Sequence, residues 1–180
     1  MYEDLDYTDR HLSVSDYLDK LHQVSSFTNT TTIYNSNYDE LSVREFNSKM
    51  SNVSNFIILI ITKNNDVFGL YQQDSIIVPR RLNRVMQITT RNKFVLFSLS
   101  SMSEFTIIER VKENDKTLLM QSETSSMLLS CYSAFWITTD GSIRLHPLIT
   151  NNYIINKDTD LLPNKVNSHT LQSLYCFALD

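Results

Sequence analysis

The chain has very little glycine, and its two cysteines stand far apart. Gly69 and Gly141 are the only glycines among 180 residues, so no glycine-rich loop can bring several backbone N–H groups close to a phosphate. Cys131 and Cys176 form no Cys-x-x-Cys pair, which disfavours a zinc knuckle or a disulfide framework. These absences argue against a nucleotide enzyme or a disulfide-held domain, and they predict two buried thiols.

Long apolar runs and an excess of positive charge are also missing. No run of about 18 apolar residues occurs, so we expect no membrane-spanning segment. The start, Met1–Asp6, lacks the basic and apolar stretches of a secretory signal, and we therefore expect a cytoplasmic location. The net charge is −4, whereas nucleic-acid binding needs a concentrated positive field, so we expect no nucleic-acid partner.

What the chain does contain is enough apolar sequence, 42%, for one well-buried core. Near the start, Val14, Tyr17, Leu18, Leu21 and Val24 follow one another at spacings of three and four, which predicts an amphipathic helix within 13–24. We divide the chain into an acidic segment with this helix, 1–25, and a domain, 26–180. The polar stretch 25–32 is expected to be a linker or an extended lead-in, and the helix either packs on the domain or associates with another copy.

A second helix is predicted from Val43 to Met50. Ser42 and Glu45 have the spacing of a capping box, in which each side chain satisfies a free N–H of the first turn. The inward face of this helix would consist of Val43, Phe46 and Met50.

A hairpin follows this helix. The continuous run 56–62 fits a strand buried on both faces, and a polar turn joins it to a second strand, 67–71. A glycine inside a strand marks a bulge or a close approach by another backbone, and Gly69 is in that position. Shorter apolar segments then recur at 94–97, 105–108, 118–120, 127–129, 135–138, 143–145 and 174–179. This pattern favours an α+β, β-rich fold, namely a two-sheet antiparallel β-sandwich flanked by short helices.

The order of these motifs resembles a TLDc domain. That family begins with a Tyr-x-Ser motif and a short helix, continues with a hairpin that carries Val-Phe-Gly, and adds a phenylalanine-rich strand. The matching segments here are Tyr34-Asn35-Ser36, the helix with Phe46, Val67-Phe68-Gly69 and Phe94-Val95-Leu96-Phe97-Ser98-Leu99. The later part departs from the family, because Gly141–Pro147 replaces its usual Gly-x-Ser-x-x-Cys segment.

The resemblance implies a β-sandwich that works by binding proteins. It connects the chain with oxidative-stress protection and with binding to the vacuolar proton pump, and it implies no accepted set of catalytic residues. The residues agree with this view. A nucleophilic site would have to combine Cys131 with His146 and Asp140, and the histidines have no metal-ligand spacing, so we expect neither catalytic residues nor a cofactor or metal.

Two features could contact a partner. Arg80, Arg81 and Arg84 begin a basic cluster that continues to Arg91 and Lys93, which is either a solvated loop between strands or a patch for an acidic partner. Trp136 follows Phe135 in a predicted strand, so one ring must point inward and the other outward. An outward Trp136 would suit a partner surface.

Two hypotheses of function remain. The first is a non-enzymatic interaction module, and the alternative is a thiol-dependent hydrolase or peroxide-consuming enzyme that uses Cys131 or Cys176. The reactivity of the thiols separates them, because a reactive cysteine must favour the thiolate.

Overall fold

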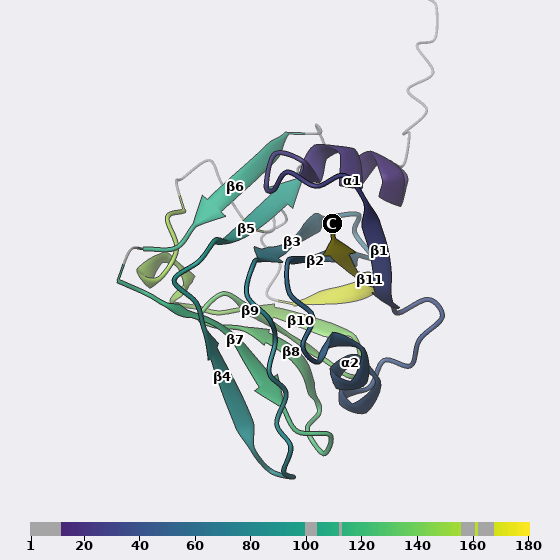
Figure 1. Cartoon of the computed structure of the whole chain (residues 1–180), viewed down its shortest axis with the longest axis vertical. Coiled ribbons are helices and arrows are strands. Elements are labelled where there is room, and N and C mark those ends of the chain that lie inside the picture. Colours follow the sequence, from purple (N-terminus) through teal and green to yellow (C-terminus); the bar gives the residue numbers. More distant parts are fainter. Residues whose placement is uncertain (1–11, 100–103, 112, 156–160, 162–167) are drawn as a thin grey trace, which may run out of the picture.

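A computed structural model of the chain describes residues 12–99, 104–111, 113–155, 161 and 168–180. Within this part the fold is β-rich and antiparallel, with two short α-helices, α1 (Val14–Leu21) and α2 (Val43–Met50) (Figure 1). The acidic residues before His11 lie outside the described part. Neither α-helix in the described part is long and apolar enough to cross a membrane.

The described strands number eleven, and nine of them contain the predicted apolar segments in the predicted order. They are β1 (Thr30–Asn35), β2 (Phe56–Thr62), β3 (Val67–Gln72), β4 (Val85–Thr89), β5 (Phe94–Leu99), β6 (Phe105–Glu109), β7 (Lys116–Gln121), β8 (Met127–Cys131), β9 (Phe135–Thr138), β10 (Ser142–Leu145) and β11 (His169–Leu179). A short 3-10 helix, Ile149–Asn151, follows β10.

All of these strands are hydrogen-bonded into one sheet, with the order β4-β7-β8-β9-β10-β11-β2-β3-β5-β6 and with β1 beside β11. The prediction of two separate sheets needs correction for this reason. The long strand β11 makes the connection, because His169 and Thr170 pair with β10 whereas residues from Leu171 onward pair with β2. The pairing shifts register between Leu171 and Ser173, at the point where β11 passes from one part of the sheet to the other.

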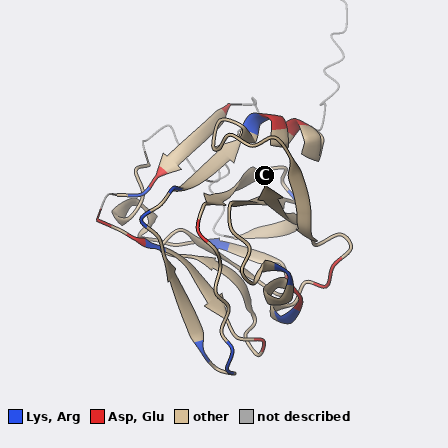
Figure 2. Cartoon of the chain, in the orientation of Figure 1, with Lys and Arg blue, Asp and Glu red and all other residues tan. Residues whose placement is uncertain are grey.

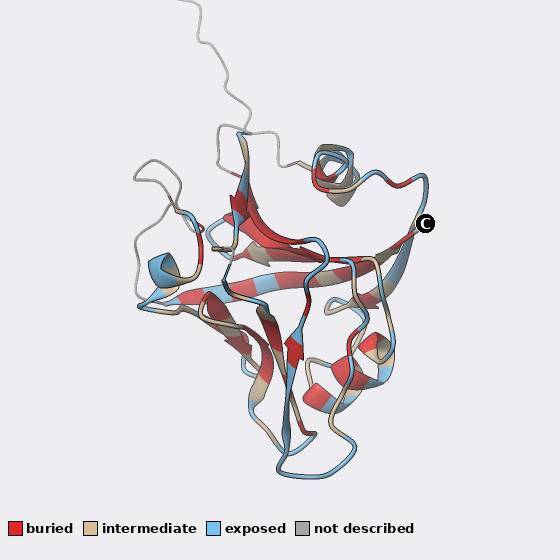
Figure 3. Cartoon of the chain, turned by 60° about the vertical axis from the view of Figure 1, so that its left-hand side comes forward, coloured by how far each residue is buried: buried red, intermediate tan, exposed pale blue. Residues whose placement is uncertain are grey.

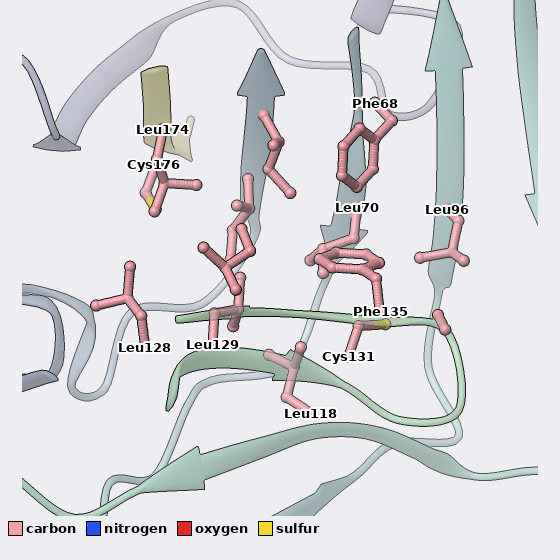
Figure 4. Packing of buried hydrophobic residues seen from close by; sticks show 14 of the residues in the cluster. Phe68, Leu70, Leu96, Leu118, Leu128, Leu129, Cys131, Phe135, Leu174 and Cys176 are labelled. Carbon is pink, nitrogen blue, oxygen red and sulfur yellow. The ribbon is translucent and has the colours of Figure 1, made fainter. Parts of the chain in front are cut away.

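The sheet folds over so that its two halves face each other across the main core. We call β1, β11, β2, β3, β5 and β6 the covered half, and β4, β7, β8, β9 and β10 the open half. Phe68 of β3 meets Phe135 of β9 edge to face, with ring centroids 5.0 Å apart. Figure 4 shows Phe68, Leu70 and Leu96 opposite Leu118, Leu129 and Phe135. This core contains apolar side chains from both halves.

Helix α1 lies on the other face of the covered half, where it closes a second core (Figure 3). Leu21 and the following Val24 are fully buried there against Ile57 and Leu59 of β2. Meanwhile Ile58 and Ile60 of β2 point into the main core. Burial on both faces explains the continuous apolar run of β2, as predicted. It also means that the apolar face of α1 packs within the chain.

Helix α2 has the predicted bounds, and Ser42 caps it as predicted. The reciprocal bond of the predicted capping box is not formed, because the N–H of Ser42 donates to the carbonyl of Glu40 at 2.9 Å. The side chain of Ser42 accepts a hydrogen bond from the backbone N–H of Glu45 at 3.2 Å, and Val43, Phe46 and Met50 are buried. Asn47 donates through its side-chain nitrogen to the carbonyl of Gln121 at 2.8 Å. This bond attaches α2 to β7 of the open half.

The prediction of a close approach at Gly69 is confirmed. Gly69 pairs with Leu59 on one side and with Phe97 on the other. A Cβ atom at position 69 would collide with the carbonyl oxygen of Ile58 and lie 2.7 Å from the ring of Phe97. Glycine is therefore required by space, since the neighbouring atoms belong to the central strands of the sheet.

Two strands lie in stretches that carry a weak apolar pattern, and both are at an edge of the sheet. Residues Thr30–Thr32, expected to be a linker or an extended lead-in, are extended: they begin β1 and pair with Phe177–Leu179 of β11. Strand β4 lies inside the region expected to be a solvated loop, and it pairs with β7. The sequence analysis did not identify β4 because its apolar pattern is weak.

Candidate functional site

Arg80, Arg81 and Arg84 lie together where the chain turns into the edge strand β4. All three side chains are exposed. In Figure 2, the blue colour of Lys and Arg marks the lower end of β4 and the chain beside it. Among the described residues, no carboxylate oxygen lies within 4.0 Å of their guanidinium groups. The positive charge of this tip is therefore not neutralised by an ion pair within the described chain.

Apolar side chains stand between these arginines. Leu82, Val85 and Ile77 are 65%, 56% and 55% exposed, so each leaves more than half of its surface in water, and Met86 is also exposed. Exposed apolar groups that lie together mark sites of interaction, whereas single ones do not. We call this set the arginine patch; it consists of Ile77, Arg80, Arg81, Leu82, Arg84, Val85 and Met86.

The arginine patch encloses an open groove of about 350 Å³. The groove is lined by residues 77–81 and by Arg84, Val85 and Met86. A groove lined by both apolar side chains and arginines suits an apolar side chain that is flanked by negative charge.

The tip of the patch is held in a defined conformation. Asn83 has a left-handed backbone with φ of 56°, which asparagine adopts more readily than most residues. Its N–H donates to the hydroxyl oxygen of Ser122 at 3.0 Å, and its side-chain oxygen accepts from Thr124 at 3.1 Å. These bonds attach the turn to the loop after β7, so the groove is largely preformed.

The structure separates the predicted basic cluster into two groups. Arg91 and Lys93 follow the end of β4. That end, Thr89, lies about 14 Å from the start of the strand at Val85, at the usual rise per strand residue. Lys93 lies over the ring of Tyr71 at 5.9 Å. Arg80, Arg81 and Arg84 therefore form a local group of their own.

Trp136 is not part of the arginine patch. It lies on β9, three strands from β4 in the sheet order. As the alternation predicts, Phe135 is buried and Trp136 is half-buried. Trp136 pairs with Arg144 of β10 and contacts the ring of His146 edge-on at 6.4 Å. Its role in binding stays a prediction.

The apolar members of the patch were missed by the sequence analysis. Ile77, Leu82, Val85 and Met86 fall on no clear helical or alternating pattern, and they read as a loop. One signal could have indicated these residues. Large apolar side chains occur there among arginines, and arginine and methionine are enriched at interfaces.

Both cysteines are buried thiols, as predicted. Burial raises the pKa of Cys131 to about 12, although the Tyr153 hydroxyl, 3.5 Å from its sulfur, opposes this shift. Burial likewise raises the pKa of Cys176 well above its ordinary value. At neutral pH both groups are protonated, and a protonated thiol is a poor nucleophile.

The chain does not assemble the sequence candidates for nucleophilic catalysis. Cys131 pairs with Phe135 at the start of β9, whereas Asp140 follows the other end of that strand. Asp140 instead accepts hydrogen bonds from Thr138 and from the N–H of Ser142. The ring of His146 accepts from the N–H of Leu148 at 3.1 Å.

A metal centre needs several ligand side chains close together. Within the ranges that the structure describes, no three or more His, Cys, Asp or Glu side chains come together in a way that could hold a metal ion. The arginine patch is therefore the candidate site, because it combines exposed charge, exposed apolar side chains and a groove.

Comparison with models of protein families identifies the family of the chain. The TLDc domain model matches residues 11–142, which is well over half of the sequence, so the chain belongs to the TLDc domain family. The match includes α1 and ends near the start of β10, where the motifs depart from the family pattern. A search of curated proteins found no match to this chain.

Proposed function

We propose that this TLDc domain is a non-enzymatic protein-interaction module and that the arginine patch is its binding surface. The supporting observation is the combination of three exposed arginines, which form no ion pair with any residue that the structure describes, with exposed apolar side chains around a groove. Arginine suits such a surface because its planar guanidinium group forms paired hydrogen bonds with carboxylates. The partner then presents carboxylates around an apolar anchor.

The finer parts of the proposal come from the family resemblance. We propose a cytoplasmic protein linked to oxidative-stress protection, with subunits of the vacuolar proton pump as the first partners to examine. Trp136, on the open half, is a second candidate contact because its half-buried ring offers an interface anchor.

The state of the thiols supports binding over thiol chemistry. A hydrolase or peroxide-consuming enzyme needs a thiolate that its substrate can reach. Cys131 and Cys176 are both buried, and desolvation raises the pKa of each. The alternative of a thiol-dependent enzyme therefore has less support than the interaction module.

Affinity capture from a cell extract tests the proposal with two variants of equal charge change. The first carries Arg80→Glu and Arg84→Glu in the patch, and the second carries Arg91→Glu and Lys93→Glu beyond the other end of β4. The unmodified chain and the second variant should recover the same partner, and the first should lose it.

Two results would contradict the proposal. If both variants keep the same partner, the arginine patch is not the binding surface. If the unmodified chain recovers no partner but consumes peroxide or hydrolyses an ester in a cysteine-dependent reaction, the chain is an enzyme.

A further inference from the structure

The arginine patch continues into an unpaired edge of the sheet. Strand β4 is the last strand on its side and pairs only with β7 among the described strands. In an antiparallel pair, alternate residues of an edge strand direct their N–H and C=O groups away from the neighbour. The outer edge of β4 thus offers hydrogen-bonding groups directly beside the groove.

The side chains of β4 are mostly exposed. Val85, Met86, Gln87 and Thr89 are exposed, and Ile88 alone is buried in the strand. Val85 and Met86 line the groove as well as the edge. A chain that paired with β4 would therefore place one of its side chains into the groove.

The charge decides between possible occupants. A second copy of this chain that paired antiparallel through its own β4 would direct Arg80, Arg81 and Arg84 of each copy towards Arg91 and Lys93 of the other, and like charges at an interface are unfavourable. An acidic segment would instead place carboxylates beside the three guanidinium groups. Such a segment must be extended, because only an extended backbone matches the spacing of a strand edge.

We propose that β4 accepts an extended acidic segment of the partner protein as an additional strand. Backbone hydrogen bonds hold the segment along β4, its carboxylates meet the arginines, and one apolar side chain fills the groove between Ile77 and Met86. This inference rests on the proposed interaction function and specifies how the arginine patch recognises its partner.

The test uses synthetic peptides of about eight residues, a usual strand length, and the full chain labelled with ¹⁵N. The first peptide alternates glutamate and valine. A second peptide has the same sequence but is N-methylated at every second amide, and it is made in two versions, with the methyl groups on the odd-numbered or on the even-numbered residues. Each version keeps its charge and loses the N–H donors of one edge of the strand. A third peptide has lysine in place of glutamate.

The first peptide should shift the NMR signals of β4 amides and leave those of β2 and β3 in place. Only one of the two methylation patterns blocks the peptide edge that pairs with β4. That pattern removes several backbone hydrogen bonds and should weaken binding about tenfold or more, so the two methylated peptides should differ in affinity. Lysine replacement should abolish binding, as should Arg80→Glu with Arg84→Glu. The variant with Arg91→Glu and Lys93→Glu should bind normally.

Three results would overturn strand addition. They are equal affinity of all the methylated and unmethylated acidic peptides, no shift of β4 amides with the first peptide, and binding only to vesicles that contain phosphatidylserine. The last result would make the patch a membrane-contact surface. If affinity capture still depends on Arg80 and Arg84 while methylation has no effect, the interaction function stands and strand addition is wrong.

Discussion

The two halves of the sheet differ in how their faces are covered. In the covered half, every residue of β3 and β5 is buried, because the open half lies on one face and α1 lies on the other. In the open half, β9 alternates between buried and half-buried residues, and β4 has a single buried residue. The central strands of the covered half therefore use all of their residues for packing, whereas β4 in the open half leaves most of its residues exposed to solvent.

Under the proposed function, stability and recognition belong to different strands. The covered half should tolerate few changes, since close-packed interiors respond to a single added or removed methyl group. The arginine patch should tolerate charge changes without loss of folding. Substitutions in the two regions therefore provide a direct way to test the division.

The largest effect is expected for Phe135→Ala, which removes the ring that joins the two halves. Phe135 is fully buried and meets Phe68 edge to face. Loss of a buried phenylalanine costs about 3–5 kcal/mol, and urea unfolding should show this decrease in the free energy of unfolding. Phe135→Leu should cost clearly less. A loss below about 1 kcal/mol would mean that the halves do not depend on this contact.

Gly69→Ala should be the next most damaging change. Its added methyl group would meet the carbonyl oxygen of Ile58 and the ring of Phe97, and neither central strand can move without disturbing its partners. Overpacking of this kind costs about 2–3 kcal/mol, measurable by urea unfolding. Ser42→Ala is a milder reference at about 1 kcal/mol, the usual cost of a lost helix cap. Gly69→Ala at or below that reference would show that the sheet is less tightly packed.

The buried thiols predict a loss of stability at alkaline pH. The pKa of Cys131 is about 12 in the folded chain and about 8.5 in an unfolded one, so the folded state retains the proton longer. Its contribution to stability is complete below about pH 8.5 and decreases as the pH rises towards 12. Between pH 7 and 10 the free energy of unfolding should fall by about 2 kcal/mol through this group.

The variant Cys131→Ala should show a smaller decrease over the same range. Alkylation by iodoacetamide at pH 8 gives an independent measurement, because both thiols should react only after unfolding in urea. Rapid alkylation of the folded chain would disprove the burial and would favour the thiol enzyme.

The smallest effect on stability is expected in the arginine patch. Arg80→Glu with Arg84→Glu alters exposed side chains that have no ion pair in the described chain, so the free energy of unfolding should change by at most about 0.5 kcal/mol. Thermal unfolding is sufficient to check this. A large loss would show that the arginines support the fold rather than a partner.

Much of the covered half could be predicted from sequence because burial on both faces leaves an unmistakable apolar run. The run of β2, the place of Gly69 and the capped helix α2 were all predicted from local patterns. The joining of the two halves was not, because it depends on the pairing of Thr170 with Ser142 across the fold. Residues that pair at such a distance in the sequence leave no local signal.

The candidate site was predicted only in part. The three arginines were identified by their charge, but the sequence placed them in one cluster with Arg91 and Lys93, which β4 separates from them. β4 itself was missed because a strand with one buried residue has no apolar alternation. The groove depends on how residues 77–81 lie beside Arg84–Met86, and this follows from the turn at Asn83.

Hydrogen–deuterium exchange of the full chain should be measured alone and with the partner recovered by affinity capture. Binding should slow exchange in residues 77–89 and leave exchange in α1, β2 and β3 unchanged. Protection on α1 or along the covered half, with 77–89 exchanging as before, would contradict the assignment of recognition to the open half.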